Sequence, residues 1–229
     1  MPAQPKTTMT ARPRIALIHA TPVAIEPIQA AFKAAWPEAE TVNILDDSLS
    51  VDRAKDAELT SAMYERFRTL ADYAVSYGAD GILFTCSAFG AAIEAAAEMH
   101  PIPILKPNEA MFEEALAKGT RIGMVSTFAP AMASMEVEFA QAAAGRDPQP
   151  VLQSVLAPGA MDALRDGDAA THNRLVAEAA AGLTNVDAIM LAHFSTSRAL
   201  EAVRAKVSVP VLTSPAAAVA RMRSRVGNE

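Results

Sequence analysis

Short apolar runs alternate with longer segments of helical periodicity along most of the chain. In the first half, the apolar runs predict buried strands at 14–19, 40–45, 80–85 and 102–105. In the second half, they predict strands at 121–126, 151–156, 187–192 and 209–212. Helical spacing predicts helices over 22–36, 58–77, 88–99, 129–144, 171–183 and 196–205. Strands separated by helices of this length are typical of βαβ units, so each half is predicted to form a parallel sheet.

The two halves of the chain repeat each other at one spacing. RIALIH, which starts at Arg14, lies 107 residues before RIGMVS, which starts at Arg121. DGILFT pairs with DAIMLA, and IPIL pairs with VPVL, at the same spacing. A period this long is not that of a solenoid repeat, so it indicates a duplicated α/β unit. The alternative is that any two βαβ halves look alike.

The same spacing places Cys86 opposite His193 in the repeat. Each comes one step after an apolar strand and before a helix, at the sheet edge where open α/β folds bind ligands. We therefore expect the two side chains to face each other across a cleft and to act as an acid–base pair. A helix N-terminus at each position is expected to favour a thiolate and to oppose an imidazolium. The alternative for each residue alone is a structural role.

Small hydroxyl residues surround this pair. The expected substrate-binding residues are Thr21, Ser48, Thr85, Ser87, Ser126, Thr127, Ser195 and Thr196. Hydroxyls and backbone N–H groups at helix N-termini are suited to binding a carboxylate. Ser48 belongs to the polar segment 46–56, which is expected to be a loop, either solvated or near the site. His19, at the end of the first strand, is a further candidate for the cleft.

Composition and charge narrow the class of protein. The net charge of −6 and the pI near 5.3 argue against a nucleic-acid partner. The sequence contains no run of about 18 apolar residues, so it predicts no membrane span. A single cysteine fits a reducing cytoplasm, and no zinc-type spacing or phosphate loop calls for a metal or cofactor. Residues 1–12 are polar and are expected to form a disordered leader.

These segments resemble the aspartate/glutamate racemase superfamily, which includes hydantoin racemases, maleate isomerases and arylmalonate decarboxylases. The resemblance rests on GADGILFTCSAFG, on VDAIMLAHFSTS in the matching half, and on the two proline-containing strands, from residue 13 to about 222. It implies two α/β lobes related by a pseudo-twofold axis, with helices on both faces of each sheet and the active site between the lobes. The last strand and helix are expected to return to the first lobe. Lobe 1 would then hold 13–106 and 210–229, and lobe 2 would hold 107–209.

This chain departs from the family pattern at one catalytic position. Racemases of this family place one cysteine in each lobe, and Cys86 falls on the first position. The second position reads Leu191-Ala192-His193-Phe194, so histidine replaces the second cysteine. The HATPVA segment is closer to the hydantoin racemase and arylmalonate decarboxylase branches than to glutamate racemase.

The family chemistry moves a proton at the carbon next to a carboxylate, without a cofactor. The leading expectation is a racemase or isomerase of a small acid, an amino acid or a hydantoin. Because a Cys–His pair is asymmetric, a decarboxylase or lyase on the same scaffold is the first alternative. A non-catalytic metabolite-binding protein is the second alternative. A homodimer or higher homo-oligomer is expected, with no nucleic acid or membrane partner.

Overall fold

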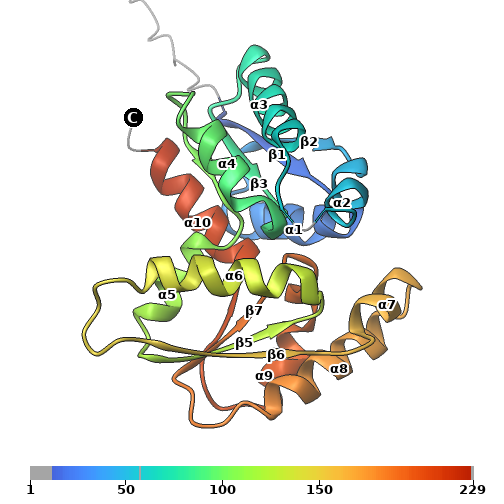
Figure 1. Ribbon diagram of the computed structural model, residues 1–229, viewed down its shortest axis with the longest axis vertical. Coiled ribbons are helices and arrows are strands. Elements are labelled where there is room, and N and C mark those ends of the chain that lie inside the picture. The colour runs from blue at the N-terminus through green and yellow to red at the C-terminus, as the bar shows by residue number, and fades with distance from the viewer. Residues whose placement is uncertain (1–11, 57, 228–229) are drawn as a thin grey trace, which may run out of the picture.

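The computed structural model describes residues 12–56 and 58–227 and contains two parallel sheets (Figure 1). The first sheet has the strand order β2-β1-β3-β4, and the second has the order β6-β5-β7-β8. The strands of the first are β1 (Arg14–His19), β2 (Glu40–Leu45), β3 (Gly81–Phe84) and β4 (Ile104–Leu105). Those of the second are β5 (Arg121–Ser126), β6 (Val151–Leu156), β7 (Ala188–Leu191) and β8 (Val211–Thr213). The predicted α/β class with two parallel sheets is confirmed. Of the expected leader, residues 1–11 lie outside the described residues.

Helices cover both faces of each sheet. Those before β5 are η1 (Pro22–Ala24), α1 (Ile25–Ala35), α2 (Ser48–Arg53), α3 (Ser61–Ser76), η2 (Ser87–Phe89), α4 (Gly90–Ala97) and α5 (Glu109–Leu116). Those after β5 are α6 (Ala129–Ala142), α7 (Ala160–Arg165), α8 (Ala169–Ala181), η3 (Ser195–Ala199), α9 (Leu200–Arg204) and α10 (Ser214–Val226). No helix within the described ranges combines the length and the apolar composition that a membrane span needs.

The inner strands are buried on both faces because their side chains alternate between two cores. In β1, Ala16 and Ile18 join the core under α3 and α4, whereas Ile15 and Leu17 join the core under α1 and α10. This alternation explains why the strands read as continuous apolar runs in the sequence. It also leaves only the strand ends free to carry polar chemistry.

The internal repeat is preserved in the strand pairing. In the first sheet Ile82 pairs with Ile104, and in the second Ile189 pairs with Val211, 107 residues later in both strands. Asp80 and Asp187 also play matching roles, since each carboxylate accepts a hydrogen bond from the backbone N–H at the start of β1 or β5, at 2.7 and 2.9 Å. The repeat spacing therefore predicts strand neighbours as well as strand positions.

The last strand lies in a different lobe from the one expected. Residues 210–229 were assigned to the first lobe, but β8 pairs with β7 in the second sheet. The reason is the repeat itself, because β8 is the counterpart of β4, which is the edge strand next to β3. Only α10 returns to the first lobe, where Met222 packs in the same core as Leu17 and Phe32.

The chain crosses between the lobes at two neighbouring points. The first crossing follows β4 and leads into α5, and the second joins β8 to α10. Asn108 and Ser214 lie at these crossings, are both fully buried, and are joined by a 2.6 Å hydrogen bond from the Ser214 hydroxyl to the Asn108 side-chain oxygen. The two crossings are thus held side by side inside the molecule.

Three short helices, α2, α5 and α7, occupy segments for which the sequence pattern predicts no helix. Helix α2 lies in the segment 46–56, which was predicted to be a loop, and α7 lies in the corresponding segment after β6. Helices α2 and α7 have only six residues each, which is too short for apolar periodicity to stand out in the sequence. Both follow the second strand of their sheet, so the repeat places them at equivalent edges.

Helix α6 brings a buried carboxyl group to the contact between the lobes. Both carboxyl oxygens of Glu138 are buried, and within the described part of the chain neither has a hydrogen-bond partner. A side chain at Gly90, where α4 begins, would overlap this carboxyl group. Burial raises the pKa of Glu138 to about 7; Lys106 opposes this shift, and the charges of Glu94 and Glu109 add to it.

Replacing Glu138 with Gln should stabilise the protein at alkaline pH. The pKa is raised in the folded state, so the native protein keeps this proton between pH 4.5 and 7 and the unfolded chain does not. Stability therefore falls as pH rises through this window, by up to about 3 kcal/mol for a shift of this size. Urea unfolding should give similar free energies for Glu138→Gln and the parent at pH 4.5, and a larger value for the variant at pH 8. Equal stability of the two proteins at pH 8 would contradict the buried-proton interpretation.

Candidate functional site

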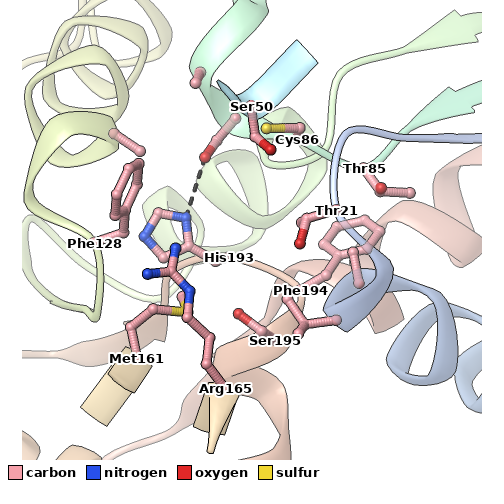
Figure 2. A pocket seen from close by; sticks show the side chains of 15 residues that line it. Thr21, Ser50, Thr85, Cys86, Phe128, Met161, Arg165, His193, Phe194 and Ser195 are labelled. Atoms are coloured by element: carbon pink, nitrogen blue, oxygen red, sulfur yellow. Dashed lines mark hydrogen bonds between the residues drawn. The ribbon is translucent and has the colours of Figure 1, made fainter. Parts of the chain in front are cut away.

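A cavity of about 110 Å³ lies between the lobes at the carboxyl ends of the strands (Figure 2). The first lobe contributes Thr21, Val23, Ala24, Ser50, Thr85, Cys86, Ser87 and Ala88. The second contributes Phe128, Ala131, Met161, Arg165, His193, Phe194 and Ser195. The two residues that the repeat places opposite each other, Cys86 and His193, therefore line one cavity. Its position at the strand ends is where ligands bind in open α/β sheets.

Cys86 follows β3 in extended conformation, with φ of −116°, and is the N-cap residue of η2. Its side chain is partly exposed to the cavity. Burial raises the pKa of the Cys86 thiol above its ordinary value, although a hydrogen bond from the Ala88 N–H and the charge of Arg53 act in the opposite direction. The expected helix N-terminus is present, but desolvation outweighs it, so the thiol and not the thiolate is favoured.

His193 has a left-handed backbone conformation, with φ of 70°. This region is uncommon for residues other than glycine, and such conformations cluster at functional sites. The imidazole lies between two serine hydroxyls: Nδ1 is 3.1 Å from Ser87 Oγ and Nε2 is 2.9 Å from Ser126 Oγ. The dashed line in Figure 2 marks the first of these bonds, which joins the two lobes. The strained backbone thus aims the ring across the cleft.

The imidazole is uncharged at neutral pH. Burial lowers the pKa of His193 from 6.5 to about 4, because a desolvated ring loses the hydration that stabilises its cation. In the neutral ring, one nitrogen donates a hydrogen bond and the other accepts one. One serine hydroxyl therefore accepts from the ring, and the other donates to it. Together with the raised pKa of Cys86, this makes the thiol with neutral imidazole the favoured form of the pair.

The predicted hydroxyl residues fall into three groups. Those that line the cavity are Thr21, Thr85, Ser87 and Ser195, while Ser126 contacts His193. Thr127 and Thr196 are buried next to each other, with their hydroxyl oxygens 3.4 Å apart, and are not among the lining residues. Ser48 is exposed and lies away from the cavity, where its hydroxyl bonds Asp46 at 2.6 Å and also meets Arg66. Ser50, two residues later on α2, lines the cavity instead.

His19 lies behind the cavity and does not line it. Its side chain is fully buried, with Nδ1 2.8 Å from Thr85 Oγ1 and Nε2 3.0 Å from Asn43 Oδ1. Burial lowers the pKa of His19, and the bond to Asn43 partly offsets this. The ring therefore holds the hydroxyl of Thr85, which itself reaches the cavity.

Sequence reasoning missed the residues that close the cavity from the sides. Ser50 comes from α2, Phe128 from the segment before α6, and Met161 and Arg165 from α7. The repeat is the one sequence feature that relates α2 to α7, because each follows the second strand of its half. In the described residues no group of three His, Cys, Asp or Glu side chains is placed to hold a metal ion.

Comparison with known proteins agrees with this architecture. Allantoin racemase from Klebsiella pneumoniae superposes with a TM-score of 0.72 at 22% identity, covering 94% of this chain and 88% of the other. A glutamate racemase isoform from Bacillus anthracis gives 0.72 at 14% identity, covering 95% and 83%. A mutant of arylmalonate decarboxylase gives 0.67 at 18% identity, covering 94% of each chain. At these identities the likeness concerns the fold.

Comparison with curated protein sequences gives no match to this chain. A family model does match it: residues 17–135 fit the model of Asp/Glu/Hydantoin racemase. This match covers more than half of the chain and includes Cys86 and the strands that position it. The chain belongs to the Asp/Glu/Hydantoin racemase family.

Proposed function

We propose that this protein is a cofactor-independent racemase or isomerase that moves a proton at the carbon next to a carboxylate. The observation that carries the proposal is the pair formed by Cys86 and His193, one from each lobe and both lining one cavity. A bound acid between them meets a proton donor on one face and an acceptor on the other. A two-base inversion at carbon uses this arrangement of groups.

The surroundings of the pair suit a carboxylate. Four residues that carry hydroxyls, Thr21, Thr85, Ser87 and Ser195, line the cavity. The first N–H groups of η2 and η3, next to Cys86 and His193, have no acceptor within their own helices. Removal of the proton turns the carboxylate into an enediolate, whose added negative charge these donors stabilise. Mutual orientation and desolvation then account for the rest of the catalysis.

The resting protonation state gives the two residues different roles. Neutral His193 is the base that accepts the proton from carbon, and the Cys86 thiol delivers one to the opposite face. The turnover leaves a thiolate and an imidazolium, and proton transfer between them restores the resting pair. Both ring nitrogens of His193 are hydrogen-bonded to serine hydroxyls. The proton from carbon therefore reaches the ring either through the Ser87 hydroxyl or directly, once that hydroxyl has rotated away from Nδ1. The substrates alone set the equilibrium of a racemisation, so this asymmetry changes rates only.

A decarboxylase is the second candidate, and the raised pKa of Cys86 is the observation that favours it. Loss of carbon dioxide from a malonate-type acid leaves an enediolate that needs one proton donor. A protonated thiol is ready for that step without prior proton removal. Arylmalonate decarboxylase, whose mutant shares this fold, is named for a reaction of this kind.

Exchange of the carbon-bound proton should require both residues. Amino acids, hydantoins, hydroxy acids and substituted malonates are incubated with the protein in deuterated water and followed by NMR. We expect deuterium incorporation with inversion, lowered about 10²- to 10⁴-fold in Cys86→Ala and in His193→Asn, as is typical when a general acid or base is removed. His100→Asn is the control, because His100 pairs with Asp72 outside the cavity.

The products separate the two candidates. Deuterium incorporated with release of carbon dioxide, lost in Cys86→Ala, would identify the decarboxylase. Full activity of Cys86→Ala on the substrate that reacts would overturn both proposed reactions.

The imidazole of His193 should titrate far below the usual range. Because burial lowers its pKa to about 4, the ring is expected to stay neutral down to about pH 5. Nitrogen-detected NMR of the four histidines, assigned with the His193→Asn variant, measures this directly. A midpoint above 7 would make the imidazolium the main form at neutral pH, and the roles of base and acid would then be exchanged.

A further inference from the structure

The cavity contains one fixed charge, and it is positive. Among the described residues that line it, Arg165 is the sole Arg or Lys, and there is no Asp or Glu. The other polar groups are hydroxyls, the Cys86 thiol and the imidazole, which are neutral in the favoured state. Arg165 and Met161 both come from α7 and line the cavity that His193 also lines (Figure 2).

Arg165 contributes little to the stability of its own lobe. Its nearest carboxylate is Asp162, one turn earlier on α7, at 3.8 Å, which is too long for a hydrogen bond. Both side chains are more than half exposed, at 61% and 78%, and exposed pairs of this kind contribute little to stability. Its five donor N–H groups are therefore available to a molecule in the cavity.

The position of α7 is fixed even though the helix is short. Gly159 begins it in a left-handed conformation, with φ of 74°, which only glycine adopts without strain. Ala160 is fully buried in the same core as Val176 of α8. The base of the Arg165 side chain is thus held at the edge of the cavity, and only its end is free to move.

We infer that the substrate carries a second anionic group, most simply a second carboxylate, and that Arg165 binds it. The inference rests on the proposed function, in which the hydroxyl residues of the cavity bind the reacting carboxylate. A planar guanidinium pairs with a carboxylate through two parallel hydrogen bonds, which makes it a good selector of acids. A neutral ring such as a hydantoin would leave this charge without a partner. Dicarboxylic acids are therefore favoured over the other substrate classes that the fold admits.

Binding of simple acids tests the inference without any need for turnover. Affinities for malonate, succinate, glutarate and adipate are measured by calorimetry at low salt, because exposed charges are strongly screened otherwise. Acetate, propanoate, butanoate and hydantoin are the probes that lack the second charge. We expect one dicarboxylate to bind about 10- to 100-fold more tightly than the matching monocarboxylate, as befits a charge-assisted hydrogen-bond pair. The best chain length then reports the distance between the two anion sites.

Three variants assign the preference to Arg165. In Arg165→Gln the preference for the dicarboxylate over the matching monocarboxylate should disappear. Arg165→Lys keeps the charge but loses the planar pair, so it should retain part of the preference. Arg174→Gln on α8 is the matched control, because this arginine is similarly exposed, at 55%, pairs with Glu178 on its own helix, and lies outside the cavity.

The outcomes distinguish this inference from the proposed function. Equal binding of monocarboxylates and dicarboxylates by the parent protein would overturn the role of Arg165 and leave the carboxylate site intact. A dicarboxylate preference that survives in Arg165→Gln would overturn the assignment to this residue. Absence of binding by every acid would overturn both the inference and the proposed carboxylate chemistry.

Discussion

Parallel pairing of the first and third strand in each lobe is the constraint on which the rest of the molecule depends. β1 pairs with β3, and β5 with β7, so their carboxyl ends meet at one edge of each sheet. Because both faces are covered by helices, polar chemistry is confined to these edges. Each edge joins a histidine to a hydroxyl: His19 to Thr85 in the first lobe, and His193 to Ser126 in the second. In the first lobe the histidine ends β1 and the hydroxyl follows β3, whereas in the second lobe the hydroxyl ends β5 and the histidine follows β7. Of these two histidines, only His193 therefore lines the cavity.

Much of the fold and the centre of the site follow from the sequence. Buried strands are apolar on both faces, and the spacing of 107 residues predicts their neighbours and places Cys86 opposite His193. The sequence could not predict α2 and α7, because six-residue helices lack a readable period. It also could not predict the protonation state, because desolvation of Cys86 depends on packing and exceeds the effect of the helix N-terminus. The family resemblance predicts residues 210–213 in the first lobe, whereas the repeat makes them the counterpart of β4 and so predicts their place beside β7 in the second sheet.

The neutral pair of Cys86 and His193 and the charged side chain of Arg165 have different roles in the cavity. A thiol and an imidazole that both rest uncharged place no net charge beside the reacting carbon until a proton moves. The charge of Arg165 belongs instead to α7, an element separate from the segments after β3 and β7 that carry the pair. Recognition of a substrate and reaction with it are thereby assigned to different elements, so one can change in evolution while the other is kept.

The hydrogen bond between Asn108 and Ser214 has a mechanical consequence. Two bodies joined by two short, adjacent connections keep one easy relative motion, which is rotation about the line through those connections. Sliding or twisting of one lobe on the other would pull the connections apart and break a buried bond. Rotation about these crossings is therefore the motion that would change the separation between the thiol and the imidazole with the buried bond intact.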